Sequence, residues 1–296
     1  MNSLNINNIS LKIGPDKILN NISFSINKGS IHALIGDNGA GKTSLIRLIL
    51  GLIPVNMGEI VTDDGIKIEE YRKNIGSVID SIVPDMKSSC LTYLHNVCYM
   101  LGINDAGYEK NLLEKVGLSN VKNKPIGKLS YGMKKRLMIA CALSGKPQLL
   151  VLDEPFNGID SKGMNEMRLL LQKLRTEGVT ILITSHIISE LLKVADVYTI
   201  IQKGNIVDTI SMKNLYQTKY PKIIVRPIDI SKFVCLINEK YSDCYFSTSS
   251  DDTITIFNMT REEYMKIFDN VTVKKIEQET MNEEDVLLWK MNCMQT

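Results

Sequence analysis

Apolar and polar positions alternate in a regular way along the first two thirds of the chain. Apolar runs at residues 31–35, 149–152 and 180–184 have the length of short buried strands. Each run is followed by a loop and then by residues whose apolar positions recur with helical spacing. Strands that alternate with helices are typical of a mostly parallel sheet. The pattern therefore predicts an α/β domain over residues 1–210.

Three helical patterns lie together inside this domain, at residues 91–103, 107–116 and 133–143. No strand of comparable strength separates them. We interpret this part as a helical insertion, a subdomain that covers about residues 85–145.

The pattern changes after Ser211. Residues 222–226, 245–247, 253–257 and 271–276 read as strands, and residues 230–240 and 262–268 read as helices. An amphipathic helix at residues 282–291 ends the chain, and we expect it to pack on this region through its apolar face. The pattern predicts a small α+β domain over residues 211–296. It contains no motif with assignable chemistry, and regulation, dimer stabilisation and capping all stay open as roles.

The composition is close to neutral. The 296 residues are 44% hydrophobic and 23% charged, with 35 Lys and Arg against 33 Asp and Glu, for a net charge of +2. This balance excludes a disordered polyanion binder and gives no indication of a nucleic-acid partner. The basic run at residues 134–136 is therefore interpreted as a solvated helix face.

Signals for a membrane span, secretion or a zinc site are missing from the sequence. The longest apolar stretches, such as residues 45–55, are shorter than the roughly 20 residues that cross a bilayer. The first ten residues lack the basic and apolar segments of a secretory signal. The six cysteines form no C-x-x-C pair, which indicates reduced thiols in a cytosolic protein.

A glycine-rich loop follows the predicted strand at residues 31–35. The segment GDNGAGKT fits G-x-x-x-x-G-K-[ST] and opens a helical run at residues 44–50. Its backbone N–H groups and the helix N-terminus can bind phosphate oxygens, Lys42 can reach the β and γ phosphates, and Thr43 can bind Mg²⁺. The predicted nucleotide-binding residues are Gly36, Asp37, Asn38, Gly39, Ala40, Gly41, Lys42, Thr43 and Ser44.

Two carboxylates end the strand at residues 149–152. In a parallel sheet, ligands bind beyond the carboxyl ends of the strands, where Asp153 and Glu154 emerge. We expect Asp153 to bind Mg²⁺ and Glu154 to polarise the water that attacks the γ phosphate.

Two further motifs identify a family. Leu129-Ser130-Tyr131-Gly132-Met133 precedes a helix, and Thr184-Ser185-His186 ends the strand after the carboxylate pair. With these motifs in this order, residues 4–204 resemble the ATP-binding subunits of ABC transporters. The resemblance implies the fold of a P-loop NTPase with a helical insertion, and ATP and Mg²⁺ as cofactors.

The resemblance also implies a second subunit. Ser130, Gly132 and Met133 match the signature loop, which in the family contacts the γ phosphate held by the opposite subunit. His186 matches the switch histidine that touches the γ phosphate, and Asp160 ends the Asn157–Asp160 loop that couples the two sites. An ordinary Asn-Gly turn is the alternative interpretation of that loop. Two ATPase subunits packed head to tail, as a homodimer, are implied.

The sequence departs from the family pattern at two positions. Asp80 stands where the family usually has a Gln near Mg²⁺, and acidic residues there resemble the exporters that protect bacteria from bacitracin and lantibiotics. We assign Asp80 as a metal-binding residue, with a solvated loop residue as the alternative. Ile13 stands near the usual adenine-stacking aromatic residue, so we expect roughly 10- to 100-fold weaker nucleotide binding and poor discrimination between ATP and GTP.

The motifs lead to an energy-coupling ATPase. The resemblance implies that it drives a separate membrane permease, that the exported substrate is a peptide antibiotic for immunity or resistance, and that the ATPase lies on the cytoplasmic face of the membrane. The helical insertion carries the contact with the permease. An exporter ATPase for another substrate and a soluble ABC factor acting on ribosomes or DNA are the alternatives. A metabolic P-loop kinase does not explain Ser130 and His186.

Overall fold

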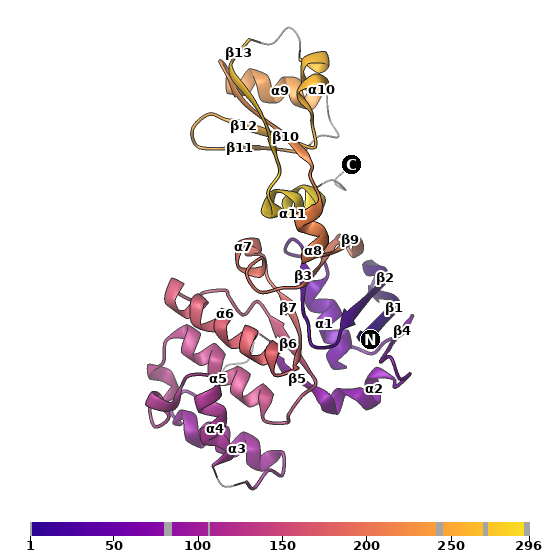
Figure 1. Cartoon of the computed structure of the whole chain (residues 1–296). Helices are drawn as coiled ribbons and strands as arrows, with labels where there is room; N and C mark the ends of the chain where they lie inside the picture. Colours follow the sequence, from indigo (N-terminus) through magenta and orange to yellow (C-terminus); the bar gives the residue numbers. More distant parts are fainter. Residues whose placement is uncertain (1, 80–84, 106, 241–244, 269–271, 293–296) are drawn as a thin grey trace. The chain divides into compact units, whose positions relative to one another are not determined.

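The computed structural model of the chain describes residues 2–79, 85–105, 107–240, 245–268 and 272–292 (Figure 1). The chain divides into two units, Met1–Thr209 and Ile210–Thr296, and each has its own apolar core.

A six-stranded sheet forms the centre of the first unit. Its strand order is β5-β6-β7-β3-β8-β9, and the neighbours from β5 to β8 pair in parallel. Every residue of β3, β6 and β7 is buried, as expected for parallel strands with both faces covered. The strands are β3 (Ile31–Ile35), β5 (Ile75–Val78), β6 (Leu149–Asp153), β7 (Thr180–Thr184), β8 (Val197–Gln202) and β9 (Asn205–Ser211).

A second sheet, which the sequence pattern did not predict, lies at the N-terminus. Its antiparallel strands β2 (Asp16–Asn27), β1 (Asn2–Ile13) and β4 (Glu59–Val61) lie in that order. Helix α1 (Lys42–Leu50) contacts both β2 and β6, so its apolar side chains share one core with both sheets. Short turns of helix follow at α2 (Ile68–Tyr71) and at Arg72–Asn74.

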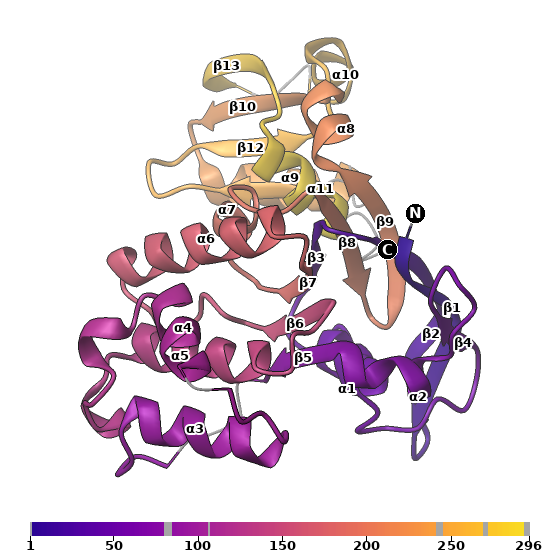
Figure 2. The ribbon, with the colours of Figure 1, turned by 60° about the horizontal axis from the view of Figure 1, so that its bottom comes forward.

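The predicted helical subdomain contains α3 (Cys90–Met100), α4 (Tyr108–Lys115) and α5 (Tyr131–Leu143), which contact one another (Figure 2). Helices α3 and α5 begin earlier than predicted because Ser89 and Ser130 cap them through their side chains. Short 3₁₀ turns, Ser119–Val121 and Ile126–Lys128, lie between α4 and α5. Helix α5 also packs on β5, α6 (Ser161–Thr176) packs on β7, and α7 (Ile188–Leu191) follows β7.

The interpretation of residues 134–136 as a solvated helix face is wrong for two of the three side chains. Lys135 is 7% exposed and Arg136 is 6% exposed. Arg136 donates hydrogen bonds to the carbonyl oxygens of Val116 (2.9 Å) and Gly117 (3.3 Å) and pairs with Glu166 at 2.7 Å. Carbonyl and carboxylate acceptors therefore make burial of these charges possible, where the sequence suggested water.

The second unit is a four-stranded antiparallel sheet with helices on one face. Its strand order is β11-β12-β10-β13, and side chains of α9 and α10 share the apolar core with the sheet. The final helix packs within this unit, as predicted: it contacts α8, and the Trp289 ring lies 4.7 Å from that of Tyr220. The elements are α8 (Met212–Gln217), β10 (Pro221–Pro227), α9 (Ile230–Lys240), β11 (Phe246–Thr248), β12 (Ile254–Phe257), α10 (Arg261–Ile267), β13 (Val273–Thr280) and α11 (Glu283–Asn292).

In the described part of the chain, every helix is too short or too polar to cross a membrane.

Candidate functional site

The loop between β3 and α1 is shaped by its glycines. A Cβ atom at Gly36 would lie 2.2 Å from the carbonyl oxygen of Ile201, so no larger residue fits there. Gly41 has φ +110°, which favours glycine, and α1 begins at the next residue. Asp37, Asn38 and Gly39 are exposed, whereas Ala40 is buried. The sequence thus places an exposed loop directly before a helix N-terminus, where anions bind favourably.

Lys42 folds back over this loop. Its Nζ donates hydrogen bonds to the carbonyl oxygens of Gly36 (2.6 Å) and Asp37 (3.0 Å), and the residue is 7% exposed. Burial lowers the pKa of Lys42, while the negative charges of Glu154, Asp153 and Asp37 act in the opposite direction. The ammonium group therefore lies among the predicted phosphate-binding and acidic residues.

Asp153 is held by hydroxyl groups on two other elements. It ends β6 opposite Thr184 of β7 in the parallel register. Its Oδ1 accepts a hydrogen bond from Thr184 Oγ1 at 2.5 Å, and its Oδ2 accepts one from Thr43 Oγ1 at 3.4 Å. A carboxylate and a hydroxyl oxygen at the base of a phosphate loop fit the oxygen ligands that Mg²⁺ prefers, with substrate phosphates supplying further ligands.

Glu154 has an unusual backbone held by hydrogen bonds. Its φ is +49°, a left-handed conformation that side-chain-bearing residues rarely adopt. Its N–H donates to the carbonyl and hydroxyl oxygens of Thr184 (3.2 and 3.0 Å), and its carbonyl oxygen accepts from Lys135 Nζ at 2.5 Å. These contacts hold the turn that directs the Glu154 side chain away from the strand.

The Glu154 carboxylate contacts His186, which follows β7. Glu154 Oε2 lies 2.9 Å from His186 Nδ1 and accepts a weaker hydrogen bond from the His186 N–H at 3.4 Å. The Glu154 side chain is 17% exposed and the His186 side chain 50% exposed. A proton acceptor and an accessible imidazole therefore lie together at the carboxyl edge of the sheet.

The signature residues lie at two neighbouring helix starts. Ser130 caps α5 by accepting from the Met133 N–H (3.2 Å), and Asp160 caps α6 by accepting from the Gly163 N–H (2.9 Å). A Cβ atom at Gly132 would lie 3.3 Å from Ile159 Cγ2 and 3.7 Å from the Gly163 Cα, so these two helix starts touch closely.

The structure thus brings together some of the predicted residues. Lys42, Thr43, Asp153, Glu154 and His186 form one cluster. A second cluster lies at the starts of α5 and α6 and contains Ser130, Gly132, Met133 and Asp160. Each cap hydrogen bond is local to its own helix, and the close approach at Gly132 brings the two helix starts together.

Two further predicted positions stand apart from both clusters. Asp80 lies outside the described residues. Ile13 is the last residue of β1 and is 54% exposed, and the predicted weak nucleotide discrimination stays a prediction.

Sequence reasoning missed the roles of two residues in the first cluster. Thr184 bonds to both Asp153 and Glu154, and its place at the end of the strand beside β6 was a usable signal. Lys135 reaches the Glu154 carbonyl from a helix 19 positions earlier, and no local pattern indicated that contact.

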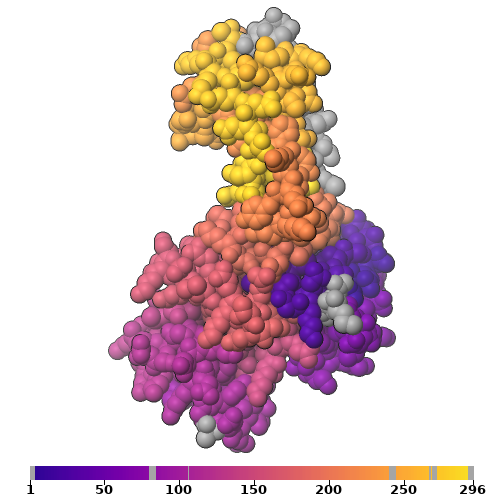
Figure 3. Space-filling model, in the orientation of Figure 1, coloured from indigo at the N-terminus to yellow at the C-terminus, as the bar shows by residue number. Residues whose placement is uncertain are grey.

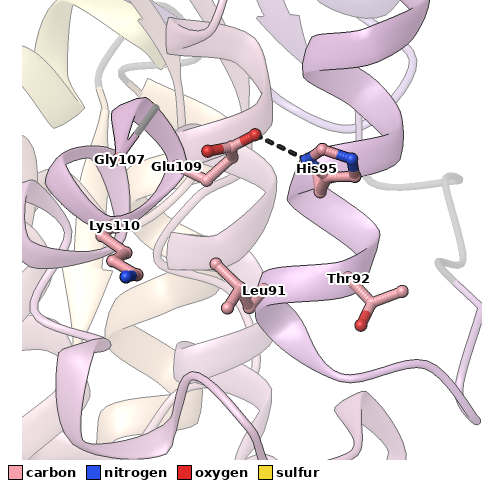
Figure 4. A pocket seen from close by; sticks show the side chains of 6 residues that line it. All are labelled: Leu91, Thr92, His95, Gly107, Glu109 and Lys110. Atoms are coloured by element: carbon pink, nitrogen blue, oxygen red, sulfur yellow. Dashed lines mark hydrogen bonds and ion pairs between the residues drawn. The ribbon is translucent and has the colours of Figure 1, made fainter. Parts of the chain in front are cut away.

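A concave surface in the helical subdomain lies outside both clusters. His95 Nδ1 on α3 lies 2.8 Å from Glu109 Oε1 on α4, beside Leu91 and Thr92 (Figure 4). Partial burial opposes the charge of Glu109, but hydrogen bonds from its own backbone and from His95 outweigh it and lower the pKa of the carboxyl. This hydrogen bond joins the two helices at this surface.

Comparisons with known proteins agree on one family. The ABC transporter domain family matches residues 19–157. The lantibiotic transport ATP-binding protein SrtF of Streptococcus pyogenes is 38% identical over 204 residues, which cover 69% of this chain and 89% of that protein. The bacitracin transport ATP-binding protein BcrA of Enterococcus faecalis is 34% identical over 270 residues, which cover 86% of this chain and 83% of that protein. A solved nucleotide-free ATP-binding cassette from an ABC transporter has a TM-score of 0.66 at 25% identity, covering 74% of this chain and 96% of that one.

Proposed function

Because this chain belongs to the ATP-binding subunits of ABC transporters, which hydrolyse ATP and work with membrane permeases, we propose that it powers the export of a peptide antibiotic. One observation carries the catalytic part of this proposal. The ends of β3, β6 and β7 bring Lys42, the Asp153–Glu154 pair and His186 into a single cluster.

Glu154 is the proposed general base. A water oxygen bonds to the γ phosphorus while its proton passes to the Glu154 carboxylate, and the bond from that phosphorus to the bridging oxygen of ADP breaks. His186, whose Nδ1 lies 2.9 Å from Glu154 Oε2, is the proposed group that orients the carboxylate and contacts the γ phosphate. Lys42 and the N–H groups of the Gly36–Thr43 loop stabilise the charge on the β and γ phosphates.

Thr43 and Asp153 are the proposed ligands of Mg²⁺. Their oxygens lie 3.4 Å apart at the foot of the phosphate loop, and the Thr184 hydroxyl orients the carboxylate. When bound, Mg²⁺ neutralises charge on the phosphates. The role of Asp80 as a third metal-binding residue stays a proposal that rests on its sequence position.

A head-to-tail homodimer completes each site. Ser130, Gly132, Met133 and Asp160 form a cluster of their own at the starts of α5 and α6. A helix start capped by Ser130 has N–H groups available to a γ phosphate held by a second copy. Each chain therefore contributes one half to each of two sites.

The helical subdomain is the proposed contact with the permease. Tyr99, Met100 and Leu101 at the end of α3 are 69%, 77% and 54% exposed, an apolar group suited to a protein partner. Through this contact the ATPase lies at the cytoplasmic face of the membrane.

The substrate class rests on the relatives. A lantibiotic transport protein and a bacitracin transport protein both match this chain across more than four fifths of their own length. The match to the second covers 86% of this chain, which is more than the first unit alone can supply, so it extends into the C-terminal unit.

The proposal is tested in cells that carry this chain with its permease. We expect Asp153→Asn to lower the inhibitory concentration of bacitracin or a lantibiotic to that of cells without the chain, since the buried carboxylate loses the charge that holds the metal. Glu177→Gln is the matched control, because Glu177 forms a partly exposed ion pair with Lys115 outside the cluster. Equal sensitivity of all strains to every peptide tested would rule out peptide export.

A further inference from the structure

Strand β13 lies at the edge of the C-terminal sheet. In the described part of this unit it pairs with β10 alone, and its other edge is not covered by a strand. Residues Lys274, Lys275 and Glu277–Thr280 are all exposed, and the yellow atoms of this part of the chain lie on the viewed face of the unit (Figure 3). An eight-residue edge of this kind is a template for another strand.

The hydrogen-bond pattern shows which β13 groups are available. The Met281 N–H donates to the Tyr220 carbonyl oxygen at 2.8 Å, and the register continues with Lys222 opposite Glu279 and Ile224 opposite Glu277. In an antiparallel pair, alternate residues bond to the neighbouring strand. The backbone groups of Ile276 and Gln278 therefore point outward.

The charges of β13 are segregated along the strand. Lys274 and Lys275 precede Ile276, and Glu277 and Glu279 follow it. A second copy running antiparallel would place basic residues against acidic ones. We propose that β13 pairs with β13 of a second copy of this chain, centred on Ile276, to form one continuous sheet across two C-terminal units.

Geometry and charge select the same register. When Ile276 lies opposite Ile276 of the partner subunit, the outward-pointing backbone groups of the two strands meet and can form hydrogen bonds. In this register Lys275 of each copy lies opposite Glu277 of the other copy, which gives two oppositely charged pairs, one on each side of the two-fold axis. The next register allowed by the hydrogen-bond pattern is centred on Glu277 and would place two carboxylates face to face. Ile276 packs partly on its own core, so the central pair also joins two apolar side chains.

Charged edges usually prevent strand pairing, and lysines are frequent on such edges. Charged side chains can prevent strand pairing whatever the order of positive and negative residues along the strand. In β13 the two signs are arranged so that an antiparallel copy is complementary, and Lys275 and Glu277 lie on the same face of the sheet, 2.6 Å apart within the chain. The interface is independent of the proposed nucleotide sandwich, because none of its residues belongs to the site.

Disulfide crosslinking of the full-length chain without nucleotide tests the register. Lys275→Cys and Glu277→Cys are prepared separately and mixed under mild oxidation. Their Cα atoms should lie about 4.5 Å apart across the axis, within the range of about 4.4–6.8 Å that disulfides span. We expect crosslinked dimer in this mixture above the level that the native cysteines give in the unmodified chain.

A matched mixture provides the control. Lys275→Cys mixed with Glu279→Cys tests the neighbouring register, in which these two residues would face each other directly. In the proposed dimer they are diagonal and about 7–8 Å apart. Equal crosslinking in the two mixtures, or none above background in either, overturns the proposal.

Charge reversal tests the same contact without cysteines. In Lys275→Glu both facing positions are acidic, and in Glu277→Lys both are basic, so each variant should self-associate roughly 10- to 100-fold more weakly in sedimentation equilibrium. An equal mixture of the two should form heterodimers as tightly as the unmodified chain. An unmodified chain that is monomeric without nucleotide, or a mixture that stays monomeric, contradicts β13 pairing while leaving the ATPase function untouched.

Discussion

The two units differ in what their cores contain. In the described part of the chain, the buried polar and charged residues all lie between His32 and Gln202, within the first unit. The core of the second unit consists of Ile, Val, Phe, Met and Tyr side chains. Among the described residues of the second unit, the Tyr264 hydroxyl is the only buried side-chain polar atom without a hydrogen-bond partner.

This difference separates a unit with buried polar contacts from a unit with an apolar core. A buried polar group costs free energy unless it is hydrogen-bonded, so a fold retains such groups where they position a reaction. The first unit shows such groups, and each of them is hydrogen-bonded. Asp153 accepts from the Thr184 hydroxyl, Lys135 donates to the Glu154 carbonyl, and Lys42 donates to the Gly36 carbonyl. The second unit contains a smaller charged group that is less deeply buried: Lys222, whose side chain is 13% exposed, pairs with Asp285 at 2.8 Å and with Glu279 at 3.5 Å.

The largest effect should come from Glu154→Gln in the first unit. Loss of the base should lower ATP hydrolysis by the assembled complex about 10²- to 10⁴-fold, with nucleotide binding retained because Lys42 and the loop are unchanged. Phosphate release and nucleotide titration measure the two effects. Glu177→Gln is the control. If ATP hydrolysis fell less than tenfold in Glu154→Gln, Glu154 would be excluded as the general base.

The next effect concerns the pH dependence of stability. Burial lowers the pKa of His32 to about 4 from its ordinary value of 6.5, and its Nδ1 has no partner among the described residues. Between these values the unfolded chain binds a proton that the folded chain does not. Stability is therefore fully present above about pH 6.5 and falls by up to about 3 kcal/mol as the pH falls towards 4.

Urea unfolding followed by circular dichroism at pH 7 and pH 4.5 measures this loss. In His32→Gln an amide replaces the titrating ring beside Thr199, so the difference between the two pH values should shrink. The same pH difference in both chains would show that other groups cause it.

A smaller effect is expected for Lys135→Met. The variant leaves the Glu154 carbonyl without its 2.5 Å donor and frees the left-handed turn, so ATP hydrolysis should fall about tenfold, which corresponds to about 1.4 kcal/mol. Lys134→Met, at the partly exposed neighbouring position, is the control. Identical rates in the two variants would show that Lys135 does not position Glu154.

The smallest effect is expected in the second unit. Burial raises the pKa of Tyr264 to about 12, which keeps its hydroxyl neutral. Tyr264→Phe removes this unpaired group, so the free energy of unfolding should rise by about 1 kcal/mol or less, with unchanged ATP hydrolysis. Thermal unfolding and phosphate release check both values. A lower rate would mean that the core of the second unit takes part in the chemistry.

The sequence predicted the family and the α/β fold, and both are confirmed. The reason is physical: IHALI, LLVLD and TILIT are mostly apolar and buried along their whole length because both faces of their strands are covered. The N-terminal antiparallel sheet escaped prediction because register shifts along β1 interrupt the regular alternation of buried and exposed residues that marks a strand.

The missed contacts of the site share a different cause. Lys135 and Arg136 are buried through acceptors 19 to 30 positions away in the sequence, and such distances leave no local signal. The assigned roles of Ser130, Asp160 and Asp80 stay predictions, since they depend on a second chain and a metal.

The close contact between the starts of α5 and α6 determines which signature positions can vary. Gly132 faces Ile159 and Gly163 and has no room for a larger side chain without a shift, whereas Tyr131 is 46% exposed. The Tyr131 ring lies 3.1 Å from where a Cβ atom at Gly158 would be, and Gly158 has φ +72°. A side chain at 158 would meet the Tyr131 ring and would also be strained by the positive φ, so glycine is expected at 158 even in a related chain with a smaller residue at 131.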